Sequence, residues 1–241
     1  MASVICRKFG FVFIHIPKNA GVSIRRILEI DTKMHPFNFS RTTNLGIDIK
    51  KYTDPDIFKR YYKFTVVRNP WDRMVSLYHF RKKENDLFMH NMSAGKVFGP
   101  DGTIWGFKKW ILNSEIKAVE SNKVLFDLAE GKKPTKTKKT EGFLREHIDF
   151  INQLDIITDL DDNFLVDKIL RFETLSEDWN RMLKYLKIHP IPQLPRKNYS
   201  GHIHYSDYYD DDLRDFVGAM FRKDIEVFDY QFETIASGRK V

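Results

Sequence analysis

The sequence contains a single cysteine, Cys6, among its 241 residues. One thiol excludes an intrachain disulfide and a zinc site built from several cysteines. The sequence also lacks an apolar stretch of about 20 residues, the length that crosses a bilayer as a helix. Its N-terminus lacks the basic and apolar pattern of a secretory leader. These absences predict a soluble, cytoplasmic protein of a reducing compartment, without a membrane partner.

The composition is neither that of a disordered chain nor electrically balanced. Hydrophobic residues make up 42% of the chain and aromatic residues 14%, enough for a folded core. The length predicts one domain over residues 1–241. Lysine and arginine exceed aspartate and glutamate by 40 to 33, which gives a formal charge of +7. This excess favours an anionic partner, without choosing among nucleotides, sulfated or phosphorylated groups and nucleic acids.

Strand-like and helix-like segments alternate along the chain. Nearly continuous apolar runs predict buried strands at residues 9–16 and 64–67. His15, inside the first of these runs, is expected to be a packed or hydrogen-bonded core residue. Helices are expected over residues 23–30, 70–80, 104–112, 176–188 and 209–228, and further strands at 155–158 and 168–172. Alternating strands and helices predict an α/β fold, a single domain with a central parallel sheet flanked by helices.

The segment PKNAGVS, residues 17–23, lies where the first predicted strand meets the first predicted helix. The first N–H groups of a helix have no partner inside the helix, and together with the helix dipole they attract an anion. Lys18 adds a positive charge, Gly21 lets the backbone approach a ligand, and Ser23 offers a hydroxyl. The segment therefore predicts a phosphate or sulfate site. The alternative is an ordinary strand–helix turn with a surface lysine.

The order of residues in this loop differs from the P-loop of nucleoside triphosphatases, G-x-x-x-x-G-K-[ST]. That pattern has its lysine directly after the second glycine and before the Ser or Thr that binds magnesium. Here Lys18 precedes Gly21, and no lysine follows the glycine. A site for magnesium and a triphosphate is therefore poorly supported. No residues are assigned to any other metal site either.

A second motif, FTVVRNPWDRMVSLY over residues 64–78, begins with the other buried strand. Arg68 is expected at the carboxyl end of that strand, where open α/β sheets bind their ligands. A guanidinium there can hold a phosphate through two hydrogen bonds, and Ser76 on the following helix can add a hydroxyl. Arg73 and Asp72 are expected to form a surface pair. The alternative for Arg68 is a structural ion pair.

Together, FIHIPKNAGVSI and FTVVRNPWDRMVSLYHF resemble the sulfotransferases that use 3′-phosphoadenosine 5′-phosphosulfate, especially the branch that acts on carbohydrates. The likeness continues in LRFETL, residues 170–175, and in residues 198–232, so it covers most of the chain. It implies the P-loop NTPase-like sulfotransferase fold. It also implies transfer of a sulfuryl group from this donor to a hydroxyl acceptor, a glycan or a small molecule, with adenosine 3′,5′-bisphosphate as product.

The resemblance also assigns residues to the donor site. It implies that the first loop holds the 5′-phosphosulfate and that the second motif holds the 3′-phosphate. The residues carried over are Lys18, Asn19, Ala20, Gly21, Val22 and Ser23 in the loop, and Arg68 and Ser76 in the second motif. A loop before the last helix is expected to approach the 3′-phosphate through Lys197, Asn198 and Ser200, with a plain connecting loop as the alternative.

Sulfuryl transfer needs an acceptor hydroxyl in line with sulfur, stabilisation of charge, and a base. Lys18 is the expected catalytic cation, which stabilises charge on the leaving phosphate and sulfuryl oxygens. The family often has its base, a His or Glu, between the two motifs, and the only histidine there is His35. His35 is therefore the candidate base, with an ordinary loop histidine as the alternative. Glu29, Asp31 and Asp48 are the other candidates.

Three other functions stay open at this point. A P-loop kinase would turn over ATP with magnesium, which the order of Lys18 and Gly21 argues against. A nucleic-acid-binding module would bind with a steep salt dependence, but the sequence shows no known nucleic-acid motif. The third function is a sulfotransferase fold that binds a nucleotide without catalysis.

The basic run at residues 131–140 is interpreted as a solvated loop, with polyanion binding as the alternative.

Overall fold

The structure is a computed structural model, and the parts of the chain that it describes are residues 3–30, 50, 54–87, 106–112, 150–159, 161–195 and 203–234. Within it the chain divides into two compact units. The first comprises Met1–Arg68 and Gln153–Tyr199, and the second comprises Asn69–Asn152 and Ser200–Val241. Each unit is described by itself, and the expectation of a single domain stays a prediction.

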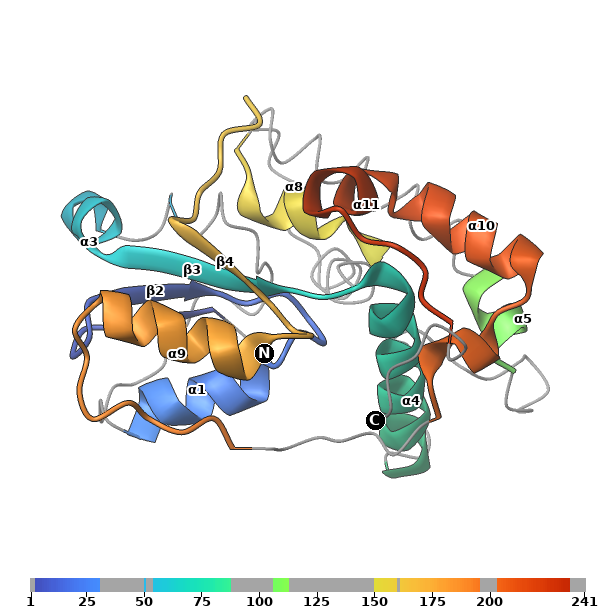
Figure 1. Cartoon of the computed structure of the whole chain (residues 1–241), viewed down its shortest axis with the longest axis horizontal. Coiled ribbons are helices and arrows are strands. Elements are labelled where there is room, and N and C mark those ends of the chain that lie inside the picture. The colour runs from blue at the N-terminus through green and yellow to red at the C-terminus, as the bar shows by residue number, and fades with distance from the viewer. Residues whose placement is uncertain are drawn as a thin grey trace, which may run out of the picture. The chain divides into compact units, whose positions relative to one another are not determined.

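A four-stranded sheet forms the centre of the first unit (Figure 1). In spatial order its strands are β1 (Val4–Cys6), β2 (Phe11–Ile14), β3 (Tyr62–Val67) and β4 (Lys168–Arg171). Strands β2, β3 and β4 are parallel, while β1 pairs antiparallel with β2. With helices on this sheet, the predicted α/β fold with a central parallel sheet is confirmed, and the antiparallel β1 makes the sheet mostly rather than wholly parallel.

Two helices, α1 (Gly21–Ile30) and α9 (Leu175–Tyr185), cover one face of the sheet (Figure 1). Their apolar side chains join those of the strands in one buried cluster. Within it the rings of Phe13 and Phe64 stack with their centroids 5.1 Å apart, and the Trp179 ring lies 6.0 Å from that of Phe64. The apolar runs predicted as strands are thus buried because helices close over them.

Helix α8 (Gln153–Ile157) occupies the place of the strand expected at residues 155–158, so that expectation is wrong. Gln153, Ile156 and Ile157 are all buried, and their spacing of three and four residues puts them on one helical face. The short apolar run fits either a strand or a helix, and the buried glutamine before it completes the helical pattern. In Figure 1, α8 lies across the sheet from α1 and α9.

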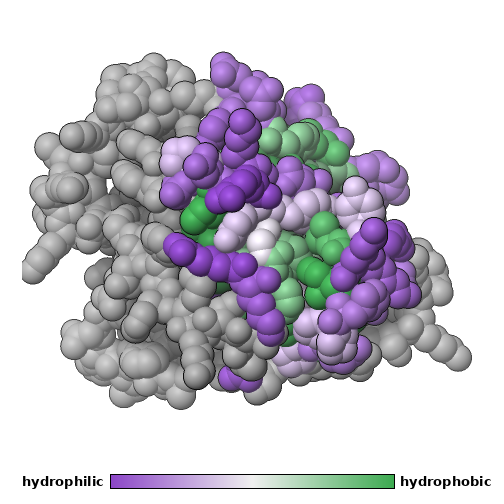
Figure 2. Space-filling view, turned by 90° about the vertical axis from the view of Figure 1, so that its left-hand side faces the viewer, coloured by the Kyte–Doolittle hydropathy of each residue, from purple (hydrophilic) through white to green (hydrophobic). Residues whose placement is uncertain are grey.

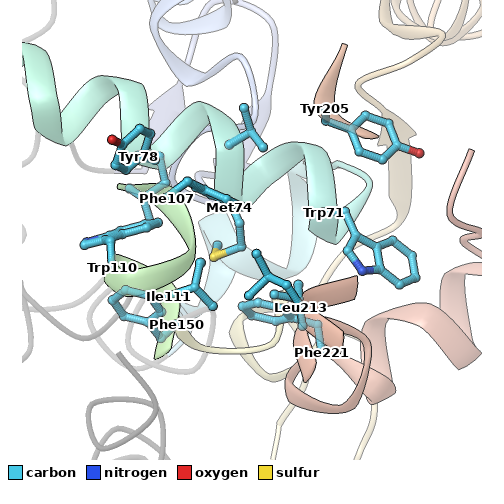
Figure 3. Close-up of a cluster of buried hydrophobic side chains, with 13 residues drawn as sticks. Trp71, Met74, Tyr78, Phe107, Trp110, Ile111, Phe150, Tyr205, Leu213 and Phe221 are labelled. Carbon is cyan, nitrogen blue, oxygen red and sulfur yellow. The ribbon is translucent and has the colours of Figure 1, made fainter. Parts of the chain in front are cut away.

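The second unit is helical in its described part. Its elements are α4 (Pro70–Leu87), α5 (Phe107–Leu112), the 3₁₀ helix η2 (Tyr205–Tyr208), α10 (Asp211–Met220) and α11 (Arg222–Phe228). Figure 3 shows side chains of these elements converging in one apolar cluster, with Met74 near its middle. Trp71 and Tyr78 of α4 belong to this cluster, so the unit has an aromatic core of its own.

Several helix boundaries follow from identifiable caps. The Asn69 Oδ1 accepts a hydrogen bond from the Trp71 N–H at 3.1 Å, as expected for a cap before Pro70. Asp54 caps the unpredicted helix α3 (Pro55–Arg60) in the same way. The single helix expected over residues 209–228 is two helices, because the backbone leaves the helical conformation at Phe221.

The described surface is mostly hydrophilic on the face that Figure 2 shows, with smaller apolar areas between charged and polar side chains. The exposed large apolar residues are scattered along the sequence: Leu112, Phe164, Tyr185, Ile203 and Val227. Isolated exposed apolar residues are normal on soluble domains. In the part of the chain that the structure describes, no helix is both long and apolar enough to cross a bilayer.

Candidate anion-binding site

The loop that links β2 to α1 makes a tight turn at residues 17–20. Lys18 and Ala20 both have left-handed backbone conformations, with φ of 71° and 56°. Left-handed residues beside right-handed ones let successive N–H groups converge, which is a common way to bind an anion. The N–H groups of Ser23 and Ile24 donate to the Ala20 carbonyl at 3.0 and 3.2 Å and so begin α1. The turn therefore presents a helix N-terminus directly after a buried strand, as the sequence predicts.

Gly21 is needed here because of His15. A Cβ at Gly21 would lie 1.9 Å from the His15 Cδ2 and 2.0 Å from its Nε2. His15 is only 2% exposed, which confirms it as a core residue. The glycine therefore lets the start of α1 pack against a buried imidazole. This packing requirement is separate from the predicted approach of a ligand to the backbone.

Arg68 brings the second motif into contact with the first. It directly follows β3, and its Nη1 donates to the Lys18 carbonyl at 3.0 Å. Its guanidinium also lies over the Phe172 ring, with the Cζ 4.0 Å from the ring centroid. A guanidinium stacks well on an aromatic face while its N–H donors remain in the plane. Arg68 is 6% exposed, so its position is set by these neighbours.

Two buried carboxamides hold the same region together. The Asn19 Nδ2 donates to the Val66 carbonyl at 2.8 Å and to the Gln153 Oε1 at 2.6 Å. The same Gln153 oxygen accepts from the Arg68 N–H at 2.9 Å, and the Gln153 Nε2 donates to the Arg68 carbonyl at 2.8 Å. Both side chains are fully buried. Gln153 cannot be recognised from the sequence, because it has no charge and stands far from both motifs.

Of the remaining predicted ligand residues, some lie in the part of the chain that the structure describes and others lie outside it. Val22 and Ser23 lie in the first turn of α1, and Ser23 is buried. Ser76 is buried on α4. Ser76 belongs to the second unit, so a role beside Arg68 stays a prediction. Other candidates lie outside the described residues: His35, Lys197, Asn198, Ser200, Asp31, Asp48 and the side chain of Glu29. The basic run at residues 131–140 also lies outside them.

Arg73 does not lie on the surface, so the expectation of a surface pair with Asp72 is wrong in its location. Arg73 is fully buried, and its Nη1 donates to the Ile151 carbonyl at 3.2 Å. Its Cζ also lies 5.7 Å from the centre of the Phe221 ring. The first two turns of α4 are buried nearly all round, so a charged residue within them is enclosed together with its apolar neighbours. Arg73 is therefore part of the interior of the second unit.

The second unit also contains a cavity of about 300 Å³. Its lining residues are Ser206, Asp207, Tyr209, Asp210, Asp211, Arg214, Phe232 and Thr234. Burial raises the pKa of the neighbouring Tyr205 to about 12 and that of Tyr209 well above its usual value. No residue predicted to bind the donor lines this cavity. In the described ranges, no group of three or more His, Cys, Asp and Glu residues is arranged to hold a metal ion.

A comparison with known protein families finds a match to the sulfotransferase family. The model of the sulfotransferase family matches residues 1–231, which include both motifs. Comparison with curated proteins finds no match, and comparison with solved structures finds none either.

Proposed function

Since the chain belongs to the sulfotransferase family and is an enzyme that transfers a sulfuryl group to a hydroxyl acceptor, we propose that its donor is 3′-phosphoadenosine 5′-phosphosulfate and its acceptor a carbohydrate. The observation that supports this proposal best is the hydrogen bond of 3.0 Å from the Arg68 Nη1 to the Lys18 carbonyl. Through this bond, the cationic residue at the end of β3 lies beside the first loop. A donor with two anionic groups on one nucleoside needs this kind of arrangement.

The residues of the loop fit the 5′ end of such a donor. The N–H groups at the start of α1 and the left-handed turn suit phosphate and sulfate oxygens. Lys18 is partly exposed, so its ammonium is the group that would reach the leaving phosphate and the sulfuryl oxygens. The donor, when bound, supplies the activated sulfuryl group. The protein contributes position and positive charge, which are the main needs of group transfer of this kind.

Arg68 fits the 3′-phosphate. A guanidinium has five N–H donors, so it can hold a backbone carbonyl and a phosphate at once. Ser76 would add a hydroxyl, and Lys197, Asn198 and Ser200 would approach the same phosphate. His35 is the proposed base for the acceptor hydroxyl. The proposed location is the cytoplasm, which agrees with the single cysteine. The alternative to the proposed activity is a protein of the same fold that binds the nucleotide without catalysis.

A ligand-binding experiment tests the donor. We expect adenosine 3′,5′-bisphosphate to raise the melting temperature, because a ligand at 100 times its Kd stabilises a protein by about 2.7 kcal/mol. Arg68→Ala and Lys18→Ala should each lose most of this stabilisation. Arg222→Ala is the matched control, because it also removes one arginine charge but from an exposed pair with Glu226. Stabilisation by ATP with magnesium that equals or exceeds that by the bisphosphate would refute the proposed donor.

Activity is tested separately, by transfer of labelled sulfate from the donor to a panel of glycans and small hydroxyl compounds. Transfer to a glycan that depends on Lys18 is the expected result. Binding of the bisphosphate without transfer to any acceptor would favour the nucleotide-binding alternative.

A further inference from the structure

The orientation of the two buried carboxamides is fixed by backbone groups. The Val66 carbonyl can only accept a hydrogen bond, so Asn19 must direct its Nδ2 toward it. The Arg68 N–H can only donate and the Arg68 carbonyl can only accept, so Gln153 must direct its Oε1 to the first and its Nε2 to the second. The Asn19 Nδ2 then meets the Gln153 Oε1 as donor to acceptor at 2.6 Å. All four contacts are therefore consistent with one arrangement.

Gln153 continues the hydrogen bonding of the sheet beyond the end of a strand. Strand β3 ends at Val67, whose carbonyl still accepts from the Phe172 N–H at 2.8 Å. Arg68 is the next residue, and its N–H and carbonyl both bond to the side chain of Gln153. A carboxamide thus pairs with both backbone groups of Arg68, much as a residue of a neighbouring strand would. These two bonds therefore fix the backbone of Arg68, and with it the position from which the guanidinium extends.

The same glutamine also holds the first loop. Through its Oε1 it binds Asn19, which lies between the two left-handed residues Lys18 and Ala20. Gln153 is fully buried, so it acts on a ligand only through these neighbours. One neutral side chain therefore sets both the loop that carries Lys18 and the residue that carries the second positive charge.

We propose that Gln153 is a positioning residue for recognition of the 3′-phosphate. It fixes the Arg68 guanidinium against the Lys18 carbonyl and so sets the distance between the two anion-binding groups. This inference rests on the proposed function, because it assumes that the ligand carries a 3′-phosphate. Without Gln153, Arg68 keeps its charge, but its backbone position is no longer fixed. Selectivity for the 3′-phosphate should therefore decrease more than the overall affinity for nucleotides.

The test compares two nucleotides that differ only in that group, adenosine 3′,5′-bisphosphate and adenosine 5′-phosphate. The ratio of their Kd values measures the gain from the 3′-phosphate. For the wild type we expect a ratio of about 10 to 100, typical of hydrogen bonds to charged groups. Arg68→Ala should bring the ratio close to 1. Gln153→Met should lower it by about tenfold. The first loop keeps the bond from Asn19 to the Val66 carbonyl, so the Kd of adenosine 5′-phosphate should change by less than about threefold.

Two further variants separate positioning from loss of stability. Gln153→Glu retains acceptors for Asn19 and for the Arg68 N–H but places a carboxylate beside the Arg68 carbonyl, so the ratio should fall there too. Thr65→Val removes a buried hydrogen bond of 2.8 Å to the Ile14 carbonyl within the same sheet. It should lower the melting temperature without changing the ratio. The double variant Arg68→Ala/Gln153→Met should have the same ratio as Arg68→Ala alone.

The possible outcomes distinguish the two proposals. If the wild type binds neither nucleotide, the proposed function fails and this inference fails with it. If the wild type prefers the bisphosphate and the folded Gln153 variants keep that preference, only the role of Gln153 is refuted. The same holds if those variants weaken binding of both nucleotides equally. A ratio that falls in both Gln153 variants and not in Thr65→Val supports the inference.

Discussion

The contact between Gly21 and His15 gives a sharp test of how the loop is built. In Gly21→Ala the new Cβ would lie 1.9 Å from the His15 Cδ2, whereas carbon atoms in contact are normally about 3.5–4.0 Å apart. The imidazole and the start of α1 would therefore have to separate by about 1.5 Å or more. Both groups are buried, so neither can move out into solvent.

The size of the effect follows from similar changes in packed interiors. Inserting a methyl group into a filled site costs about 1–3 kcal/mol. In a protein of this length, 1 kcal/mol lowers the melting temperature by about 2–4 °C, so we expect a decrease of about 2–12 °C. Because the displaced element is the N-terminus of α1, stabilisation by adenosine 3′,5′-bisphosphate should also be smaller than in the wild type.

Thermal unfolding of two further variants supplies the control and the rescue. Gly218→Ala adds a methyl group inside α10, where the Cβ would lie 3.3 Å from the Trp71 Cζ2. This mild crowding is offset by the gain of about 1 kcal/mol from alanine in a helix, so little change is expected. In His15→Ala/Gly21→Ala the clash is gone, and the double variant should lose less stability than the sum of the two single variants. An unchanged melting temperature in Gly21→Ala, or strict additivity, would refute the reasoning.

Two other predictions concern the second unit. Arg73→Met should lower the free energy of unfolding by about 1–3 kcal/mol, because the Ile151 carbonyl loses a buried donor. Arg222→Ala, at an exposed site, should change this free energy little. Equal effects of the two variants in urea unfolding would contradict the buried position of Arg73. Burial raises the pKa of Tyr205 from 10.0 to about 12, so the folded state keeps a proton that the unfolded state loses. The contribution of Tyr205 to stability is therefore complete below pH 10 and is lost as the pH rises toward 12, and urea unfolding at increasing pH should show a smaller decline in Tyr205→Phe.

The fold was predictable where the local pattern has one meaning. The apolar run at β2 and that at β3 are too continuous for a surface element, and the Asn69–Pro70 pair marks the start of α4. The pattern failed where burial depends on distant parts of the chain. Arg73 was expected on the surface because a charged residue in the first turn of a helix usually lies there, and only the packing of α4 in its cluster encloses it.

The part of the candidate site that the sequence predicts is limited to residues of recognisable motifs. Lys18 and Arg68 stand in motifs with a recognisable order, and the structure brings them together through the bond to the Lys18 carbonyl. Gln153 lies 85 residues from Arg68 in the sequence, and its bonds go to backbone atoms that every residue has. No pattern of side chains in the sequence marks such a contact.

This difference has a physical origin that applies to the whole site. A charge that binds a ligand needs a particular residue type, so it leaves a trace in the sequence. The groups that hold the charge in place need only shape and hydrogen bonds. Gln153 bonds to the backbone of Arg68, and His15 packs against Gly21. If these neutral contacts set the geometry, substitutions at neutral positions should change selectivity between ligands while the charge of the site stays the same. A substitution of Lys18 or Arg68 by a neutral residue always changes that charge as well.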